Sequence, residues 1–236
     1  MAFSQKEAPN CDWCAHRSNC FFDLLKGKED RQAWKEMRVA NRFKAGEVIF
    51  YEGDRPRSVF VVCTGNVKVY KSSRSGQQLV TRIERPGDLL GHLAILAGGS
   101  VYEGTGEAME ESVVSMMDQM VFTEFLLKHP SAALALLGAV AKDVRRGEEK
   151  ARDIAFKPAR SRLANTLLDL ARTPKDKTKP TVSGVKRKDL AEMSGLTIET
   201  TVRLVKDFEK RSLLKKQGKD LVITDEANLK SIADRF

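Results

Sequence analysis

Three cysteines in the stretch CDWCAHRSNC, residues 11–20, have the types and spacing that most clearly suggest chemistry. Cys11, Cys14 and Cys20 are spaced C-x2-C-x5-C and are three of the chain's four cysteines. The first ten residues hold no apolar signal segment, and no stretch approaches the roughly 18 to 20 apolar residues of a membrane span. The sequence therefore predicts a cytoplasmic protein. Thiols stay reduced in the cytoplasm, so a tight group of cysteines there is expected to bind metal or to undergo redox chemistry.

The charge of the chain is concentrated in its last third. The 236 residues carry a formal net charge of +9, with 22 Lys and Arg against 21 Asp and Glu up to Phe156, and 19 against 11 after it. A basic region joined to a neutral one is typical of a protein that binds nucleic-acid phosphates, although acidic lipid or protein could also attract it. The apolar content of 42% is enough for a core in each of two domains.

Residues 26–128, which follow the cysteine-containing segment 1–25, are expected to form a β domain. Short apolar segments with a two-residue period are separated there by turns that contain glycine. In the segment SVFVVCTG, Val59, Val61 and Cys63 point to one side and the residues between them point to the other. The pattern predicts an antiparallel β-roll, of the barrel or jelly-roll kind, in an α+β protein.

A long helix is predicted over residues 129–156. Apolar or small residues recur there at alternating steps of four and three, which is the seam of a two-stranded coiled coil. We expect a homodimer helix, and the alternative is an amphipathic helix packed on its own β domain. A glycine in the seam costs about 1 kcal/mol relative to alanine, which a close helix crossing would explain. The predicted interface residues are Leu137, Val140, Val144, Gly147, Ala151 and Ile154.

The basic region, residues 157–236, has the pattern of a winged helix-turn-helix. Leu190 and Ala191 fall on one short helix, Gly195 suits the turn, and Thr197 can cap a second helix. The stretch LLKKQGKDLVITD is expected to form the wing, with lysines placed for DNA phosphates. The residues expected to pack inward from the second helix are Val202, Val205 and Phe208.

Glu199 and Arg203 lie four residues apart at the start of the second helix. Because this part of a recognition helix enters the major groove, their side chains can reach adjacent bases, with the carboxylate accepting from cytosine and the guanidinium donating to guanine. The alternative is an ion pair within the helix. The predicted DNA-contacting residues are Glu199, Arg203, Thr197, Thr200, Lys188 and Lys206.

The order of β-roll, long helix and winged helix-turn-helix resembles the CRP/FNR superfamily of bacterial transcription regulators over almost the whole chain. The stretch SGLTIETTVRLVKDFEKRSLL is similar to the family segment in which a Glu and an Arg four apart contact the core of a TGA-type half-site. Glu199 and Arg203 match those two positions. The neighbouring Ile198 and Val202 differ from the residues of the cyclic-AMP and FNR branches, respectively, and leave the outer half-site bases open.

The resemblance also bears on the signal. The cyclic-AMP branch holds its ligand with a Glu and with an Arg-Ser pair, and this chain has His92, Tyr102 and Glu103 at those positions. Because Glu103 would repel the cyclic phosphate, cyclic AMP is not the expected ligand.

The FNR branch carries an N-terminal C-x2-C-x5-C and a distant fourth cysteine, which together hold a 4Fe-4S cluster. Cys11, Cys14 and Cys20 reproduce that spacing, but the alignment places Ser115 where the fourth cysteine belongs. The resemblance implies a cluster that responds to oxygen or nitric oxide. The alternatives are a regulator without a cluster, with unused or redox-responsive thiols, or one with zinc, haem or another effector. The candidates for the fourth ligand are Cys63, Asp118 and His16.

The function expected from these features is a homodimeric, sequence-specific transcription regulator, not an enzyme. Its two-fold symmetry predicts a palindromic double-stranded site resembling TTGAT, four variable pairs and ATCAA. RNA polymerase is the implied partner where the protein activates. The rival from another class is a thiol or metal redox protein with a basic docking domain, which would show no preference among DNA sequences.

Overall fold

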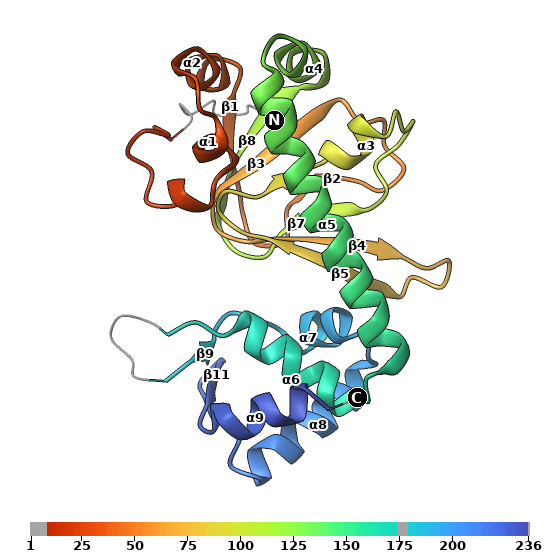
Figure 1. Ribbon diagram of the computed structural model, residues 1–236. Helices are drawn as coiled ribbons and strands as arrows, with labels where there is room; N and C mark the ends of the chain where they lie inside the picture. The colour runs from red at the N-terminus through yellow and green to blue at the C-terminus, as the bar shows by residue number, and fades with distance from the viewer. Residues whose placement is uncertain (1–8, 174–178, 236) are drawn as a thin grey trace. The chain divides into compact units, whose positions relative to one another are not determined.

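The computed structural model describes residues 9–173 and 179–235, so the first eight residues of the predicted segment 1–25 lie outside it (Figure 1). The chain divides into two compact units. The first is Met1–Gly76 with Thr81–Arg145, and the second is Gln77–Val80 with Arg146–Phe236. The division falls inside the long helix, so each unit contains one part of it.

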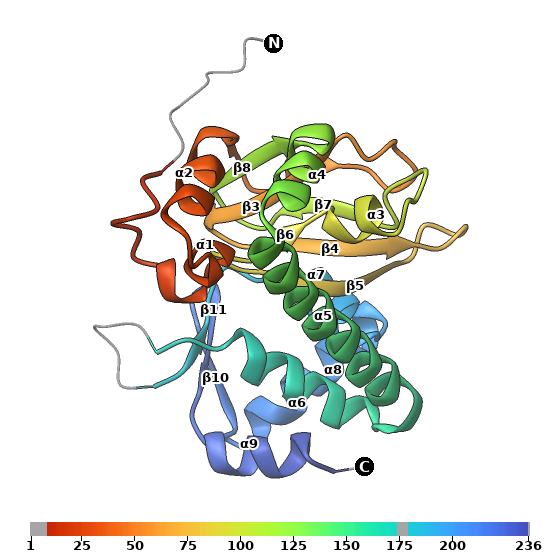
Figure 2. The same cartoon turned by 45° about the horizontal axis from the view of Figure 1, so that its top comes forward.

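Two four-stranded antiparallel sheets form the β-roll, which lies in the first unit except for the start of β5, and they confirm the predicted β-roll and the α+β class (Figures 1 and 2). Their strand orders are β1-β8-β3-β6 and β2-β7-β4-β5. The strands are β1 Val39–Phe43, β2 Val48–Phe50, β3 Ser58–Thr64, β4 Val67–Ser72, β5 Gln78–Glu84, β6 Leu89–Leu90, β7 Thr105–Ala108 and β8 Ser112–Asp118. The helices are η1 Arg17–Asn19, α1 Phe21–Leu24, α2 Lys28–Glu36, α3 His92–Leu96, α4 Gln119–Lys128 and α5 Pro130–Phe156.

Strand β3 separates two hydrophobic clusters because its side chains alternate between its two faces. Val59 and Val61 belong to one cluster with α1, α2, α4 and the start of α5. Phe60 and Val62 belong to the other, which fills the space between the sheets. The alternation that the sequence predicted for this segment is therefore confirmed, and Cys63 continues the Val59 and Val61 side.

Helix α5 has one face on the β-roll and another that is exposed. Ala132 and Leu136 are buried in the cluster beside Val59 and Val61, whereas Leu137 and Val144 are 61% and 56% exposed. The helix therefore packs on its own β-roll through one stripe and leaves the predicted seam uncovered within the chain. No single helix in the described ranges is long and apolar enough to cross a membrane; α4 and α5 meet that criterion only as a pair bent by 115°.

The second unit is a small helical domain with a three-stranded sheet, β10-β11-β9. Its core combines α6, the two helices of the helix-turn-helix and the sheet. Pro158 is the N-cap residue of α6, and two residues separate α6 from the end of α5. The elements are α6 Ala159–Leu170, β9 Thr181–Val182, α7 Arg187–Ser194, α8 Ile198–Lys210, β10 Leu214–Gln217, β11 Asp220–Ile223 and α9 Glu226–Ala233.

Candidate functional site

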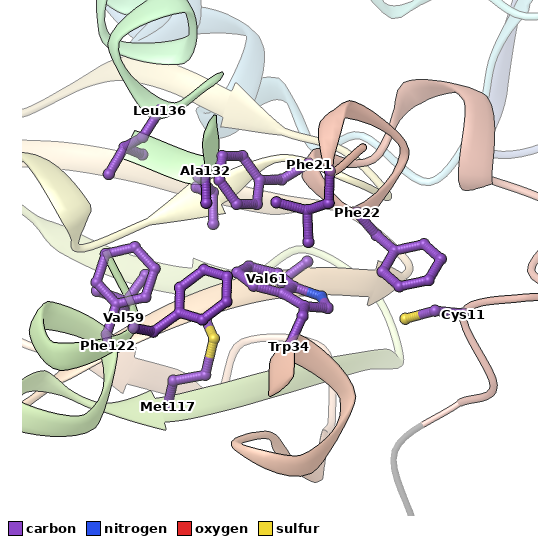
Figure 3. Packing of buried hydrophobic residues seen from close by; sticks show 13 residues of the cluster. Cys11, Phe21, Phe22, Trp34, Val59, Val61, Met117, Phe122, Ala132 and Leu136 are labelled. Carbon is purple, nitrogen blue, oxygen red and sulfur yellow. The ribbon is translucent and has the colours of Figure 1, made fainter. Parts of the chain in front are cut away.

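The cysteine segment is held in a compact turn by its own backbone. The amide of Arg17 donates to the Cys14 carbonyl at 3.1 Å, and the amide of Cys20 donates to the Arg17 carbonyl at 2.9 Å. Cys20 caps α1, which buries Phe21 and Phe22 immediately afterwards. The Phe21 ring lies 4.9 Å from that of Trp34 in α2 (Figure 3). The two phenylalanines therefore anchor the end of the segment in the hydrophobic core.

Gly87 lets the cysteine segment approach the β-roll closely. Its φ is +103°, and a Cβ there would lie 2.5 Å from the Asn19 carbonyl oxygen and 2.8 Å from the Cys20 Cα. The Gly87 amide donates to the Val62 carbonyl in β3 at 2.8 Å. Because only glycine leaves this space free, the segment lies directly against the β3 side of the roll.

All four cysteines line one pocket, which spans about 350 Å³ including space open to solvent. Cys11 lies beside the Phe22 ring in Figure 3, and both residues line the pocket. Cys11 and Cys63 are buried, and Cys14 and Cys20 are half-buried, all as free thiols. The other residues around the pocket are Pro9, His16, Arg17, Phe22, Arg38, Val61, Val62 and Gly87.

Cys63 reaches this pocket from β3. The pairing of β3 with β8 shifts register between Val62 and Thr64, so Cys63 is the extra residue of an irregular step. Such a bulge redirects a side chain. The Cys63 Sγ lies 3.2 Å from the Oγ of Ser115 on β8. Cys63 thus occupies space next to the position where the resemblance places the family's fourth cysteine.

Burial favours the protonated form of two of these thiols, Cys11 and Cys20. Desolvation raises the pKa of Cys20 to about 11, and it raises the pKa of Cys11 against the opposing charge of Arg38. Cysteine reactivity depends on the thiolate, so neither group is an activated nucleophile near neutral pH. A bound metal would remove their protons, because a coordinating thiol is deprotonated. The pocket suits metal–thiolate binding better than direct thiol chemistry.

No group of three or more His, Cys, Asp or Glu side chains in the described ranges is placed to hold one metal ion. A 4Fe-4S cluster would bind each of four cysteine sulfurs through a different iron. Of the other candidate fourth ligands, His16 lines the pocket, whereas Asp118 does not. The Asp118 carboxylate instead caps α4 by accepting from the Met120 amide at 2.8 Å.

Sequence reasoning missed Arg38, which lies between α2 and β1. Its guanidinium lines the thiol pocket, although the residue is only 8% exposed. A basic residue at the entrance to a strand normally points to solvent, and no pattern in the sequence marked it as buried. Its contacts lie far away in the sequence, at the Ser115 hydroxyl of β8 and the Pro9 carbonyl.

The residues aligned with the cyclic-AMP site have other partners. The Tyr102 hydroxyl donates to the Ser58 carbonyl at 2.7 Å, and its ring lies 4.5 Å from that of Phe50. Glu103 is exposed and pairs with Lys71 at 3.2 Å. His92 is buried, with Nε2 3.2 Å from the carboxylate of Asp143 in α5. An aromatic core residue therefore stands where the cyclic-AMP branch has its phosphate-binding arginine.

The helix-turn-helix forms as the sequence predicted, with one correction on its buried side. Gly195 adopts the left-handed conformation after α7, with φ 62°. The Thr197 hydroxyl caps α8 by accepting from the Thr200 amide at 3.2 Å. Val205 and Phe208 are buried, but Val202 is only half-buried. The third buried position is Thr201, whose polar group is satisfied because its hydroxyl donates to the Thr197 carbonyl at 3.0 Å.

The exposed start of α8 carries the predicted contact residues. Glu199 and Arg203 are exposed, and they do not form the alternative ion pair within the described residues. Thr200 is half-buried, and its hydroxyl receives a 3.0 Å hydrogen bond from Thr197. Lys206 is exposed, and Lys188 lies 3.5 Å from Glu192. The hairpin of β10 and β11 forms a wing that exposes Lys215, Lys216 and Lys219.

Two family profiles match the chain, one in each unit. Residues 40–129 match the cyclic nucleotide-binding domain, and residues 161–232 match the Crp-like helix-turn-helix domain. Together they cover more than half of the 236 residues and correspond to the β-roll and the winged domain.

Full-length relatives have the same organisation. The chain is 25% identical over 233 residues to the fumarate and nitrate reduction regulatory protein of Vibrio cholerae, covering 96% of this chain and 91% of that protein. It is 23% identical over 185 residues to the cAMP-activated global transcriptional regulator CRP of Salmonella typhimurium, covering 78% and 88%. The structure of FixK2 from Bradyrhizobium japonicum has the same fold, with a TM-score of 0.74, 22% identity and coverage of 84% and 98%. The chain therefore belongs to the CRP/FNR family of transcription regulators.

Proposed function

We propose that this DNA-binding regulator acts as a homodimer and senses oxygen or nitric oxide through a 4Fe-4S cluster held by Cys11, Cys14, Cys20 and Cys63. The observation that carries the proposal is that all four cysteines of the chain line one pocket. Nothing in the spacing of Cys63 from the others requires this. Its position beside Ser115 supports the assignment of Cys63 as the fourth ligand.

A bound cluster would supply a group that oxygen or nitric oxide can attack. The chain would contribute four thiolates, a pocket wall of Phe22, Val61 and Val62, and a short path from solvent beside the half-buried Cys14 and Cys20. The competing proposal of a regulator with bare redox-active thiols is weaker, because burial raises the pKa of both Cys11 and Cys20.

The thiol pocket shares its hydrophobic core with the long helix. Cys11, Phe21 and Phe22 belong to the same buried cluster as Ala132 and Leu136 of α5 (Figure 3). A change in the cysteine segment would therefore alter the packing of α5 without any intervening element. We infer that this shared core biases the population of dimers able to bind DNA.

The exposed seam of α5 supports dimerisation. Leu137, Val144 and Ile154 expose large apolar surfaces, and a Cβ on Gly147 would meet no atom within 4 Å in its own chain. A helix that keeps a destabilising glycine and apolar residues in water gains from a partner helix. The predicted interface of Leu137, Val140, Val144, Gly147, Ala151 and Ile154 is consistent with this exposed stripe.

The unpaired Glu199 and Arg203 at the start of α8 support base contacts in a TGA-type half-site. Two such helices in a dimer would lie about 34 Å apart and require a palindromic site. RNA polymerase would then be the partner at promoters that the protein activates. Thr197, the N-cap of α8, and Thr200 in its first turn would contact phosphates, and Lys188 and Lys206 would contact the backbone on either side.

The decisive experiment for the sensor is chemical analysis of protein purified without oxygen. About four iron and four acid-labile sulfide per chain, with visible absorbance that air bleaches, are expected. Protein without iron or sulfide after anaerobic reconstitution would refute the cluster and leave the DNA-binding assignment intact.

DNA recognition is tested by binding to a duplex with two TGA-type half-sites and to duplexes with altered cores. Glu199→Ala and Arg203→Ala should each cost about 1 to 3 kcal/mol of discrimination at the core. Lys206→Ala is the matched control, because the loss of a phosphate contact weakens binding to all sequences alike. Unchanged discrimination in the first two variants would refute base contacts by these residues.

A further inference from the structure

Arg38 is a buried cation beside the thiols. The residue is 8% exposed, and its guanidinium lines the pocket that holds the four cysteines. One terminal nitrogen lies 3.5 Å from the Ser115 Oγ, and the other lies 3.4 Å from the Pro9 carbonyl oxygen. The Nε is buried and has no hydrogen-bond partner. Two long contacts to neutral atoms thus satisfy only part of this charged group.

A buried charge normally has a partner of opposite charge, because removal from water costs several kcal/mol. Within the described residues no carboxylate forms an ion pair with Arg38. The contrast with Arg82 in the same unit is direct, since Arg82 lies 3.0 Å from Asp143 and 3.3 Å from Glu84. The charge of Arg38 therefore points to a negative group that lies outside the described residues.

The proposed ligand set would bring such a group. Four thiolates carry four negative charges, and a metal core with fewer positive charges leaves the bound group anionic. Ser115 connects the two parts, because its Oγ lies 3.5 Å from Arg38 and 3.2 Å from the Cys63 Sγ. We propose that Arg38 is the counter-charge of an anionic metal–thiolate group in the pocket and sets both its retention and its reduction potential.

This inference rests on the proposed function and makes Arg38 a positioning residue rather than a ligand. The guanidinium would stabilise the group by charge and would orient the Ser115 hydroxyl beside the Cys63 sulfur. Residues that hydrogen-bond around metal ligands change metal affinity by about 10 to 100-fold when mutated. A cation near the group also favours the state with one more electron, so its loss should lower the reduction potential.

The experiment compares the full-length wild type with Arg38→Met, Arg38→Lys and the control Arg31→Met. Arg31 lies in α2, and its guanidinium is 5.6 Å from the Phe22 ring without lining the pocket. Each protein is prepared metal-free and metal-loaded. The measurements are metal and sulfide content, the rate of metal loss to a chelator without oxygen, the potential by spectroelectrochemical titration, and the melting temperature of the metal-free form.

We expect Arg38→Met to lose metal about 10 to 100-fold faster and to have a lower potential, with Arg38→Lys intermediate and Arg31→Met unchanged. Metal-free Arg38→Met should melt at or above the wild-type temperature, because an uncompensated buried charge has been removed. If the wild type holds zinc without sulfide, the pocket is a zinc–thiolate centre. Faster loss of zinc from Arg38→Met would then still support Arg38 as the counter-charge.

Several results would overturn the inference separately from the proposed function. If the wild type holds iron and sulfide but Arg38→Met matches it in loss rate and potential, the counter-charge is refuted and the cluster stands. If the wild type holds no metal, the proposed function itself fails. If metal-free Arg38→Met melts well below the wild type, Arg38 stabilises the metal-free chain and is not an uncompensated buried charge.

Discussion

The two sides of β3 are built in opposite ways. On one side, Val59, Val61 and Cys63 face the cysteine segment, where four thiols and one unpaired cation surround an open pocket. On the other, Phe60 and Val62 pack with Phe50 and Tyr102 in a filled aromatic core. The described part of the second cluster contains no residue of α5, whereas the first contains Ala132 and Leu136.

This difference indicates where a signal can enter. In the aromatic core the Tyr102 hydroxyl is satisfied, because it both donates to the carbonyl and accepts from the amide of Ser58. The thiol side leaves the Arg38 Nε without a partner. Buried polar groups without a partner are costly unless a ligand binds them. We therefore expect this protein to sense its signal on the side of β3 that carries the cysteine segment.

The largest expected effect is on the thiol side. Cys63→Ser should lower the iron content of anaerobically reconstituted protein from about four atoms per chain to near zero, since three thiolates remain for four irons. The double variant Cys63→Ser/Ser115→Cys moves the thiol across to β8 and should restore the iron. Ser115→Ala is the control and should keep it. Full iron content in Cys63→Ser would exclude Cys63 as a ligand.

A smaller but substantial effect is expected in the aromatic core. Tyr102→Ala should reduce the free energy of unfolding by about 3 to 5 kcal/mol, because it empties a large buried site between Phe50 and Phe60. Tyr51→Ala is the control, since Tyr51 is exposed and should change stability by less than about 0.5 kcal/mol. Denaturant unfolding gives both values. Binding of labelled cyclic AMP to the wild type would contradict the assignment of the sensor to the thiol side, because it would place a ligand site in the aromatic core.

The smallest expected effect concerns the link between α2 and α5. The Asp30 carboxylate accepts from the Ser131 hydroxyl at 2.6 Å and lies 2.7 Å from the His129 Nδ1. The Ser131 hydrogen bond and then the His129 contact hold the pKa of Asp30 below its ordinary value. Such a carboxylate contributes stability that is present above the unfolded pKa of about 4 and is lost as pH falls through the lower folded pKa.

Asp30→Asn should therefore cost about 1 kcal/mol near neutral pH, and the difference from wild type should shrink as pH falls below about 4. Unfolding titrations of both proteins from pH 7 to pH 3 measure this. A difference that stays the same down to pH 3 would show that the charge of Asp30 contributes nothing. Asp234→Asn, at an exposed site in the other unit, is the control.

Local patterns predicted most of the architecture. The alternation around Val59 and the turn at Gly195 with its Thr197 cap are short-range signals, and each element formed where they indicated. The sequence did not predict that Thr201, and not Val202, is the third buried residue of α8. A buried threonine is stable there only because its hydroxyl bonds to the preceding turn, which apolar periodicity does not register.

The sequence by itself determined the cysteine spacing, the concentration of positive charge in the last third and the face of α8 that holds Glu199 and Arg203, because these depend on residues close in the chain. Only the tertiary structure decided that Cys63 joins the other thiols, that Asp118 does not, and that Arg38 is buried beside them. Those outcomes depend on a bulge in β3, on the space left by Gly87 and on helix packing, where residues tens of positions apart meet.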